Sequence, residues 1–194
     1  MKKVILFAAV LFSSISIMNV QAADPKSGVA TLTLNLNPFQ SIYIANDAGS
    51  TFSKDVHINY TSETDYIGGV SSELLNDYIK VVAAGGYEVS VNSTNFIHSA
   101  STVDPISAES VSINITEGSG TVSADATLAA NKNLIAGGEL VLVTSKEGKS
   151  GTGVDGKKFN VQYKAANQNL YTNKVVNSEL TSYTSTLTYS ISVQ

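Results

Sequence analysis

The chain has 194 residues, of which 43% are hydrophobic and only 14% charged, and it contains no Cys and no Trp. The lack of Cys excludes a disulfide framework, a thiolate metal site, a catalytic Cys and a lipoprotein anchor. All 12 basic residues are Lys, against 16 acidic residues, and this acidic balance argues against nucleic acids and anionic membrane surfaces as partners.

The first 22 residues predict a secretory signal peptide. Lys2 and Lys3 precede an apolar run over residues 4–17, and Val20-Gln21-Ala22 places small residues where cleavage after Ala22 requires them. A transmembrane anchor is the alternative, but the run is shorter than the ~20 residues that span a bilayer. We therefore expect export to the periplasm, the cell surface or the medium, and a mature chain of residues 23–194 with no membrane span.

The mature chain is predicted to open with a short polar leader, residues 23–28, and a strand at Val29–Leu36. Leu32, Leu34 and Leu36 alternate with polar residues, so the three leucines share one face of this strand. Asn37-Pro38 ends it, because Pro lacks a ladder donor. Further alternating segments predict strands at residues 39–44 and 56–60.

Residues 71–84 allow two interpretations. Leu74, Leu75, Tyr78, Ile79 and Val82 have helical spacing, which would give a helix from about Ser71 to Ala84. The favoured alternative is a β-hairpin with arms at 77–83 and 87–92 and a turn at Ala84-Gly85-Gly86.

Strands continue to the C-terminus. Alternation predicts strands at 111–115 and around Phe159–Tyr163, and a short strand is expected at 171–176. A continuous apolar run predicts a strand at 139–144 that is buried on both faces. The last strand, Tyr183–Val193, carries an apolar row at Leu187, Tyr189, Ile191 and Val193. Nine to ten short strands without a confident helix predict an all-β fold, an antiparallel Ig-like β-sandwich in a single domain.

No motif predicts a catalytic residue, a metal ligand or a cofactor. His57 and His98 fit no metal spacing, and Gly148-Lys149-Ser150 lacks the first glycine of a phosphate loop. Glu63 and Asp65 could hold Ca²⁺ weakly, but a solvated loop explains them as well. We expect a protein that is not an enzyme.

The signal peptide, the alternating strand Val29–Leu36, the Thr/Ser/Asn-rich body and the terminal strand Tyr183–Val193 together resemble bacterial fimbrial subunits of the chaperone–usher type and small secreted Ig-like surface proteins. The resemblance implies assembly by β-strand addition, in which one subunit completes the fold of its neighbour. It implies self-association or other surface subunits as partners, with a periplasmic chaperone. The strand-exchange residues would be Val29, Leu32, Leu34 and Leu36 on one strand and Leu187, Tyr189, Ile191 and Val193 on the other.

Two alternatives stay open. The first is a monomeric, secreted β-sandwich module that binds a carbohydrate or a peptide. The second is a hydrolase that uses a pair of carboxylates.

Overall fold

A computed structural model describes residues 31–36, 39–44, 55–100, 103–119, 126–145, 152, 155–166, 171–175 and 181–194. The chain divides into two units, residues up to Leu36 and residues from Asn37 to Gln194. The predicted signal peptide, its cleavage site, the leader at 23–28 and the break at Asn37-Pro38 lie outside the described residues.

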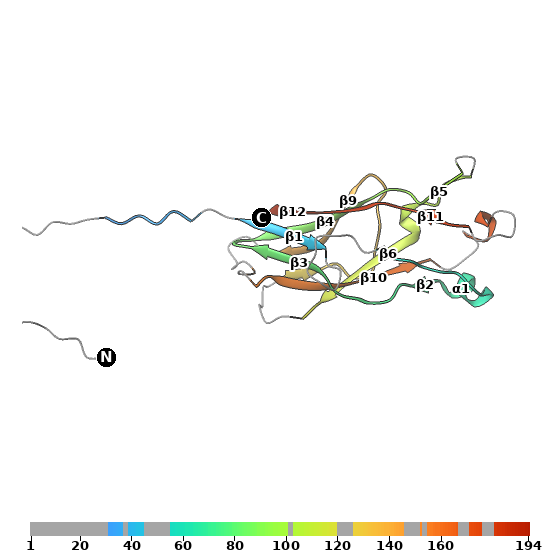
Figure 1. Cartoon of the computed structure of the whole chain (residues 1–194), viewed down its shortest axis with the longest axis horizontal. Helices are drawn as coiled ribbons and strands as arrows, with labels where there is room; N and C mark the ends of the chain where they lie inside the picture. Colours follow the sequence, from blue (N-terminus) through green and yellow to red (C-terminus); the bar gives the residue numbers. More distant parts are fainter. Residues whose placement is uncertain are drawn as a thin grey trace, which may run out of the picture. The chain divides into compact units, whose positions relative to one another are not determined.

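The described part of the second unit contains twelve strands, all paired antiparallel through their ladders (Figure 1). The first sheet has the order β1 (Gln40–Ile44), β3 (Leu75–Ala83), β10 (Lys157–Ala165), β6 (Val111–Glu117) and β8 (Lys132–Asn133), with β2 (Val70–Ser71) also on β10. The second sheet has the order β12 (Leu187–Val193), β4 (Tyr87–Ser93), β9 (Glu139–Ser145) and β7 (Ala126–Leu128). A small ribbon pairs β5 (Ile97–His98) with β11 (Tyr183–Thr184). The predicted all-β antiparallel sandwich is confirmed.

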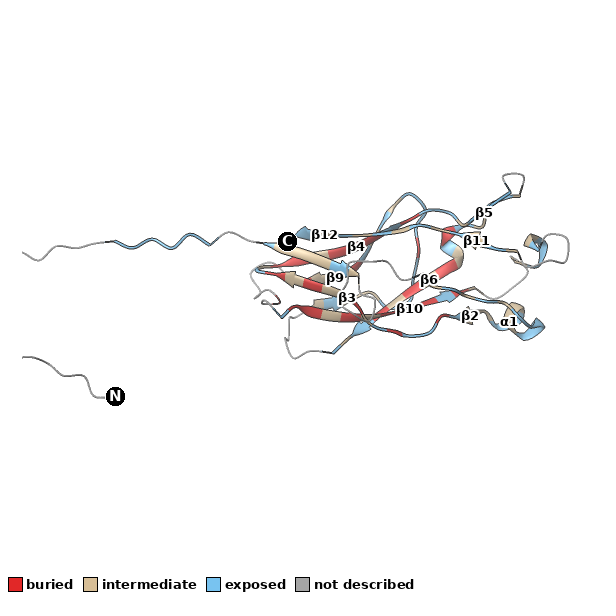
Figure 2. Ribbon diagram, viewed as in Figure 1, coloured by how far each residue is buried: buried red, intermediate tan, exposed pale blue. Residues whose placement is uncertain are grey.

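The core lies between the two sheets, and each sheet contributes alternate residues to it (Figure 2). Side chains of Ile79 and Val81 on β3, Phe159 on β10 and Val89 and Val91 on β4 are at most 1% exposed. Successive side chains on a strand point to opposite faces, so each sheet buries one apolar row and leaves the other face polar.

Within residues 71–84 the structure has the strand β3 (Leu75–Ala83) and not a helix, but the predicted hairpin is wrong. β3 pairs with β1 and β10, whereas β4 pairs with β12 and β9, so the link at residues 84–86 crosses from one sheet to the other. In a hairpin the two apolar rows would lie on one sheet. In the observed arch they face each other across the core, which buries both.

The prediction that β9 is buried on both faces is also wrong, because Val141 is 41% exposed. The register between β4 and β9 shifts at Val89 and Ser90, leaving Leu142 without a direct partner. This β-bulge turns both Leu142 and Val143 inward, and both are at most 1% exposed. The continuous apolar run therefore reflects a bulge rather than a strand covered on two faces.

Two predicted strands lack a ladder. Residues 56–60 pair with none of the strands that the structure describes, although Val56, Ile58 and Tyr60 are half-buried against the core in the predicted alternation. In the predicted strand at 171–176 the described residues instead contain a 3₁₀-helix, η2 (Thr172–Lys174). Alternation reports which face a residue occupies, and a segment lying along a core can alternate without a hydrogen-bonded neighbour.

A short helix, α1 (Glu63–Gly68), begins where the sequence suggested a loop. The Asp65 carboxylate accepts hydrogen bonds from the backbone N–H of Thr61 (2.7 Å) and of Ser62 (2.8 Å), and the Ser62 hydroxyl accepts one from Asp65 N–H (3.3 Å). This is a capping box with Asp in place of Glu. Throughout the described ranges, no helix has the length and apolar content needed to cross a membrane.

Candidate functional site

The two lateral sides of the sandwich differ. On one side the chain from β7 to β8 passes from the second sheet to the first and bonds to both. Ala129 N–H donates to the Leu142 carbonyl of β9 (2.8 Å), and the Ala129 carbonyl accepts from Ile115 N–H of β6 (3.3 Å). This side of the sandwich is closed by backbone hydrogen bonds.

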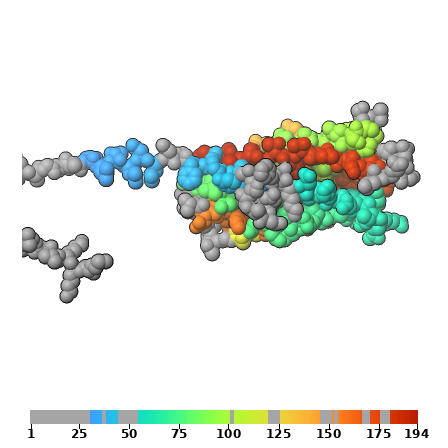
Figure 3. Space-filling model, viewed as in Figure 1, coloured from blue at the N-terminus to red at the C-terminus, as the bar shows by residue number. Residues whose placement is uncertain are grey.

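On the other side the edge strands are β1 and β12, and they lie beside each other without a shared ladder (Figure 1; Figure 3). Among the described residues, β1 pairs only with β3 and β12 only with β4. We call the line between these two strands the open seam. An unpaired strand edge presents free N–H and C=O groups and is a template for another strand.

The outward backbone groups of β12 belong to its odd-numbered residues. Thr94 N–H donates to the Thr186 carbonyl (3.2 Å) and Gln194 N–H to the Gly86 carbonyl (3.1 Å), so the even-numbered residues face β4. Antiparallel residues alternate between groups that point to one neighbour and groups that point to the other. The N–H and C=O groups of Leu187, Tyr189, Ile191 and Val193 therefore point into the open seam.

The outward backbone groups of β1 belong to its even-numbered residues. Ala84 N–H donates to the Phe39 carbonyl (2.9 Å), and Gln40 lies opposite Ala83. The odd-numbered residues of β1 therefore face β3, and the backbone groups of Gln40, Ile42 and Ile44 point into the seam.

The residues that offer backbone groups to the seam also carry its apolar side chains. Ile42 and Ile44 on β1, and Leu187, Tyr189 and Ile191 on β12, are half-buried and pack against the core. Val193, at the end of the row, is 58% exposed. A strand added here would gain ladder bonds and would cover apolar surface at the same positions.

Tyr189 anchors β12 to the opposite sheet. Its hydroxyl is hydrogen-bonded to the Tyr163 hydroxyl on β10, and its ring lies 6.3 Å from the Tyr78 ring on β3, centroid to centroid. Burial, followed by the neighbouring Tyr163, raises the pKa of Tyr189 well above its ordinary value. The edge strand is thus held at its middle while its outer backbone edge stays unpaired.

The other predicted row lies in the first unit. Leu32, Leu34 and Leu36 are 97%, 80% and 81% exposed, and residues 31–36 belong to no strand of the structure. Val29 lies outside the described residues. Three exposed leucines at alternate positions are poorly suited to water.

Of the two edges of the seam, sequence reasoning found only β12. It predicted a strand at 39–44 without assigning it a role, so Ile42 and Ile44 were missed. The available signal was a second alternating segment directly after the strand Val29–Leu36. Nothing local indicates that residues 39–44 and 187–193, at opposite ends of the chain, become neighbours.

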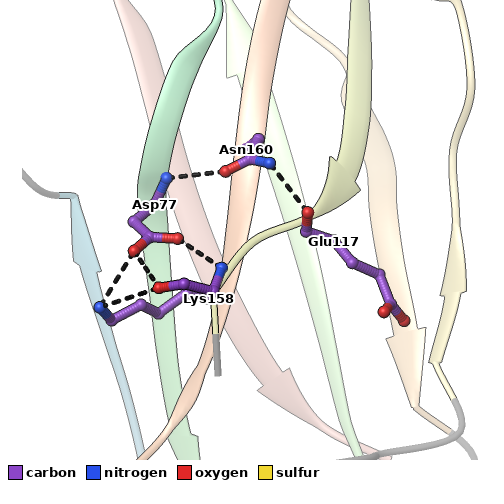
Figure 4. A network of polar contacts seen from close by, with 5 residues as sticks. Asp77, Glu117, Lys158 and Asn160 are labelled. Atoms are coloured by element: carbon purple, nitrogen blue, oxygen red, sulfur yellow. Dashed lines mark hydrogen bonds and ion pairs between the residues drawn. The ribbon is translucent and has the colours of Figure 1, made fainter. Parts of the chain in front are cut away.

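A network of polar contacts surrounds Asp77 (Figure 4). Its carboxylate accepts from Ser119 N–H (2.7 Å) and from the Lys158 ammonium (3.1 Å), while Asn160 accepts from Asp77 N–H (2.8 Å) and donates to the Glu117 carbonyl (2.8 Å). Burial acts to raise the pKa of Asp77, but the bonds from Ser119 and Lys158 outweigh it and lower the pKa. An ionised, paired carboxylate is a poor proton acceptor, so the cluster serves to fix the register of β3, β10 and β6.

Among the described residues, neither histidine belongs to a group of three His, Asp or Glu side chains. His57 is exposed, and His98 Nδ1 accepts from Ala100 N–H (3.0 Å) beside the Tyr183 ring. Glu63 and Asp65, the candidates for Ca²⁺, start α1 instead. Within the described part of the chain, no three His, Asp or Glu side chains gather in a way that could hold a metal ion.

Comparison with known proteins finds no family whose model matches this chain and no curated protein that matches it.

Proposed function

We propose that the protein is an exported, pilin-like surface subunit that assembles by β-strand addition. Residues Val29–Leu36 of one copy would enter the open seam of another, as the resemblance to fimbrial subunits of the chaperone–usher type implies. The observation that carries the proposal is the seam itself, where the residues with unpaired backbone groups are also those with half-buried apolar side chains.

The two surfaces are complementary in chemistry. The donor segment offers Leu32, Leu34 and Leu36 at every second position, and β12 offers Leu187, Tyr189 and Ile191 with the same period. Opposed residues on neighbouring strands alternate in step, so one register brings all the apolar side chains to the core face together. A shift by one residue would turn the leucines outward, which makes the pairing specific.

The donor segment and β12 also agree in length. At about 3.3 Å per residue, an eight-residue donor spans about 26 Å, and the seven residues of β12 span about 23 Å. Fully burying one Leu stabilises by roughly 1.5–3 kcal/mol, so three of them, with a new ladder, offset a large part of the cost of association, about 4–15 kcal/mol.

The test compares Leu34→Asp with Thr33→Asp in the secreted protein. Both introduce the same charge at adjacent positions, but only Leu34 lies in the apolar row. We expect Leu34→Asp to abolish multimers on size-exclusion chromatography and in mild detergent, and Thr33→Asp to retain them. The unfolding free energy of the Leu34→Asp monomer should stay within about 0.5 kcal/mol of the parent monomer, because Leu34 is 80% exposed.

Equal multimer distributions for the two variants would contradict the proposal. A Leu34→Asp monomer that is less stable by several kcal/mol would show instead that the segment packs within its own subunit.

A further inference from the structure

A polar pocket of about 260 Å³ lies beside the end of α1, where β10 ends and β6 begins. This is the end of the sandwich opposite to the C-terminus of β12 (Figure 1). Five residues with polar side chains line it, and of these Ser110 donates its hydroxyl proton to the Ser107 carbonyl (2.6 Å), which leaves Glu109, Ser112, Asn133 and Lys164 as candidate ligand contacts. The pocket shares no residue with the open seam.

Three of these side chains form a row across the outer face of the first sheet. Lys164 on β10 lies opposite Ser112 on β6, and Ser112 lies opposite Asn133 on β8. Their strand neighbours Tyr163, Ile113 and Leu134 are buried, so the row points away from the core. Neighbouring strands are about 4.8 Å apart, which places an ammonium, a hydroxyl and an amide at regular intervals.

Glu109, which also lines the pocket, belongs to the short 3₁₀-helix η1 (Ala108–Ser110), directly before β6. This turn is held at two points, because the Ser107 hydroxyl accepts from Glu109 N–H (3.3 Å) and the Asn95 side chain accepts from Ala108 N–H (3.1 Å). The backbone that carries the carboxylate is thereby fixed before any ligand arrives.

Two tyrosines, Tyr60 and Tyr171, bond to the part of the pocket wall that is formed by Ser110 and Ala166. The Ser110 carbonyl accepts from Ala166 N–H (2.8 Å) and from the Tyr171 hydroxyl (3.1 Å), and the Ala166 carbonyl accepts from the Tyr60 hydroxyl (2.6 Å). The Tyr60 and Tyr171 rings pack with centroids 5.1 Å apart. Both Ser110 and Ala166 line the pocket, so its shape is set by interactions behind it.

The lining selects for a ligand that both donates and accepts hydrogen bonds. Lys164 only donates, the Glu109 carboxylate only accepts, and Asn133 does both; the Ser112 hydroxyl donates to the Lys164 carbonyl (3.3 Å) and is left to accept. The single positive and single negative charges offset each other, so the pocket attracts neither anions nor cations strongly. A neutral polyhydroxylated ring fits this pattern, since each of its hydroxyls is both donor and acceptor.

The volume of the pocket further limits which ligands can bind. Pockets for drug-sized ligands occupy about 300–1,000 Å³, and this one is smaller. We propose that the pocket binds a single neutral monosaccharide unit of a glycan. With polar contacts alone, the affinity of a small ligand of this kind is expected to have a Kd on the order of 1 mM. Copies joined in a filament would raise the avidity for a glycan-coated surface.

The experiment titrates isotope-labelled protein, residues 23–194, with the methyl glycosides of glucose, galactose, mannose, fucose and N-acetylglucosamine. Amide chemical shifts report binding, and N-acetylneuraminic acid and diglycine serve as charged probes. The protein carries Leu34→Asp, so that the proposed strand addition does not interfere with the titration, and the chemical shifts report the pocket in whatever oligomeric state the variant adopts. We expect saturable shifts at Ser112, Asn133 and Lys164 with at least one neutral glycoside.

Asn133→Ala and Glu109→Ala should each weaken that binding about tenfold, the effect of one lost charged or bidentate hydrogen bond. Asn92→Ala, an exposed asparagine on β4 of the other sheet, is the matched control and should leave the Kd unchanged. The proposal is overturned if no neutral glycoside saturates the shifts, if only a charged probe does, or if the two pocket variants bind as the parent does.

Discussion

At the scale of single residues, two buried hydroxyls, those of Tyr87 and Ser145, have no hydrogen-bond partner among the described residues. Tyr87 is fully buried. A buried polar group without a partner costs about 1–3 kcal/mol, so we expect Tyr87→Phe to raise the unfolding free energy by about 1 kcal/mol in urea titrations. The matched control, Tyr163→Phe, removes the hydrogen-bond partner of the Tyr189 hydroxyl and should lower the unfolding free energy. If Tyr87→Phe were instead the less stable of the two variants, the prediction would be wrong.

The buried tyrosines also predict a loss of stability at alkaline pH. Burial raises the pKa of Tyr87 to about 12 and raises the pKa of Tyr163 and of Tyr189 as well. The unfolded chain loses these protons near pH 10, whereas the folded chain keeps them. The stabilisation is therefore complete below pH 10 and is lost as the pH rises through the folded-state values. Urea titrations at pH 8, 10, 11 and 12 should show stability falling from pH 10 onward, and less steeply in Tyr87→Phe. A flat profile to pH 12 would count against buried phenols.

At the scale of elements, Gly118, which follows β6 and lies against the neighbouring strand β10, should not tolerate a side chain. A Cβ there would lie 2.6 Å from Asp77 Oδ1 and 2.9 Å from the Lys158 carbonyl oxygen. Gly118→Ala must displace backbone of the Asp77 cluster, and we expect it to lower the unfolding free energy by about 1–3 kcal/mol. Gly85→Ala, where the added Cβ meets nothing within 4 Å, should be close to neutral in the same thermal and urea measurements. Similar losses in both variants would mean that glycine flexibility, rather than crowding, matters.

The elements also show what could be predicted from the sequence. Alternation correctly located strands β1, β4, β6, β10 and β12, because the face that a residue occupies is encoded by its immediate neighbours; β9 was predicted from its continuous apolar run and β3 as an arm of the hairpin. Pairing is not encoded locally. The arch between β3 and β4 and a hairpin have the same alternation and the same Gly-rich link, and only the packing of both apolar rows distinguishes them.

The candidate site was predictable only in part, for the same reason. The apolar row on β12 is visible in the sequence, but the open seam also requires Ile42 and Ile44 of β1 to lie next to that row in space. The pocket lined by Glu109, Ser112, Asn133 and Lys164 had no signal at all. Those four residues come from separate segments, and three meet only through the cross-strand register of β10, β6 and β8.

At the scale of the whole molecule, the question is what covers the open seam. The body from Asn37 to Gln194 has a core from two sheets and one lateral side closed by hydrogen bonds, so it can fold without the preceding segment. The seam nevertheless leaves backbone groups and apolar side chains unsatisfied. We therefore expect a protein lacking residues 23–36 to fold, to stay monomeric, and to be only marginally stable or dependent on a chaperone.

A synthetic Val29–Leu36 peptide should then bind the truncated protein and raise its Tm. A ligand at 100 times its Kd stabilises by about 2.7 kcal/mol, and for a domain of this size each kcal/mol shifts Tm by about 2–4 °C, so the expected rise is about 5–10 °C. A peptide with Leu34→Asp should give no rise, because it cannot place its middle leucine on the core. Unfolding of the truncated protein that no peptide reverses would place the segment within its own subunit. A full-length protein that is monomeric, heat-stable and indifferent to the peptide would leave a self-contained binding module as the better account, because its seam would need no partner.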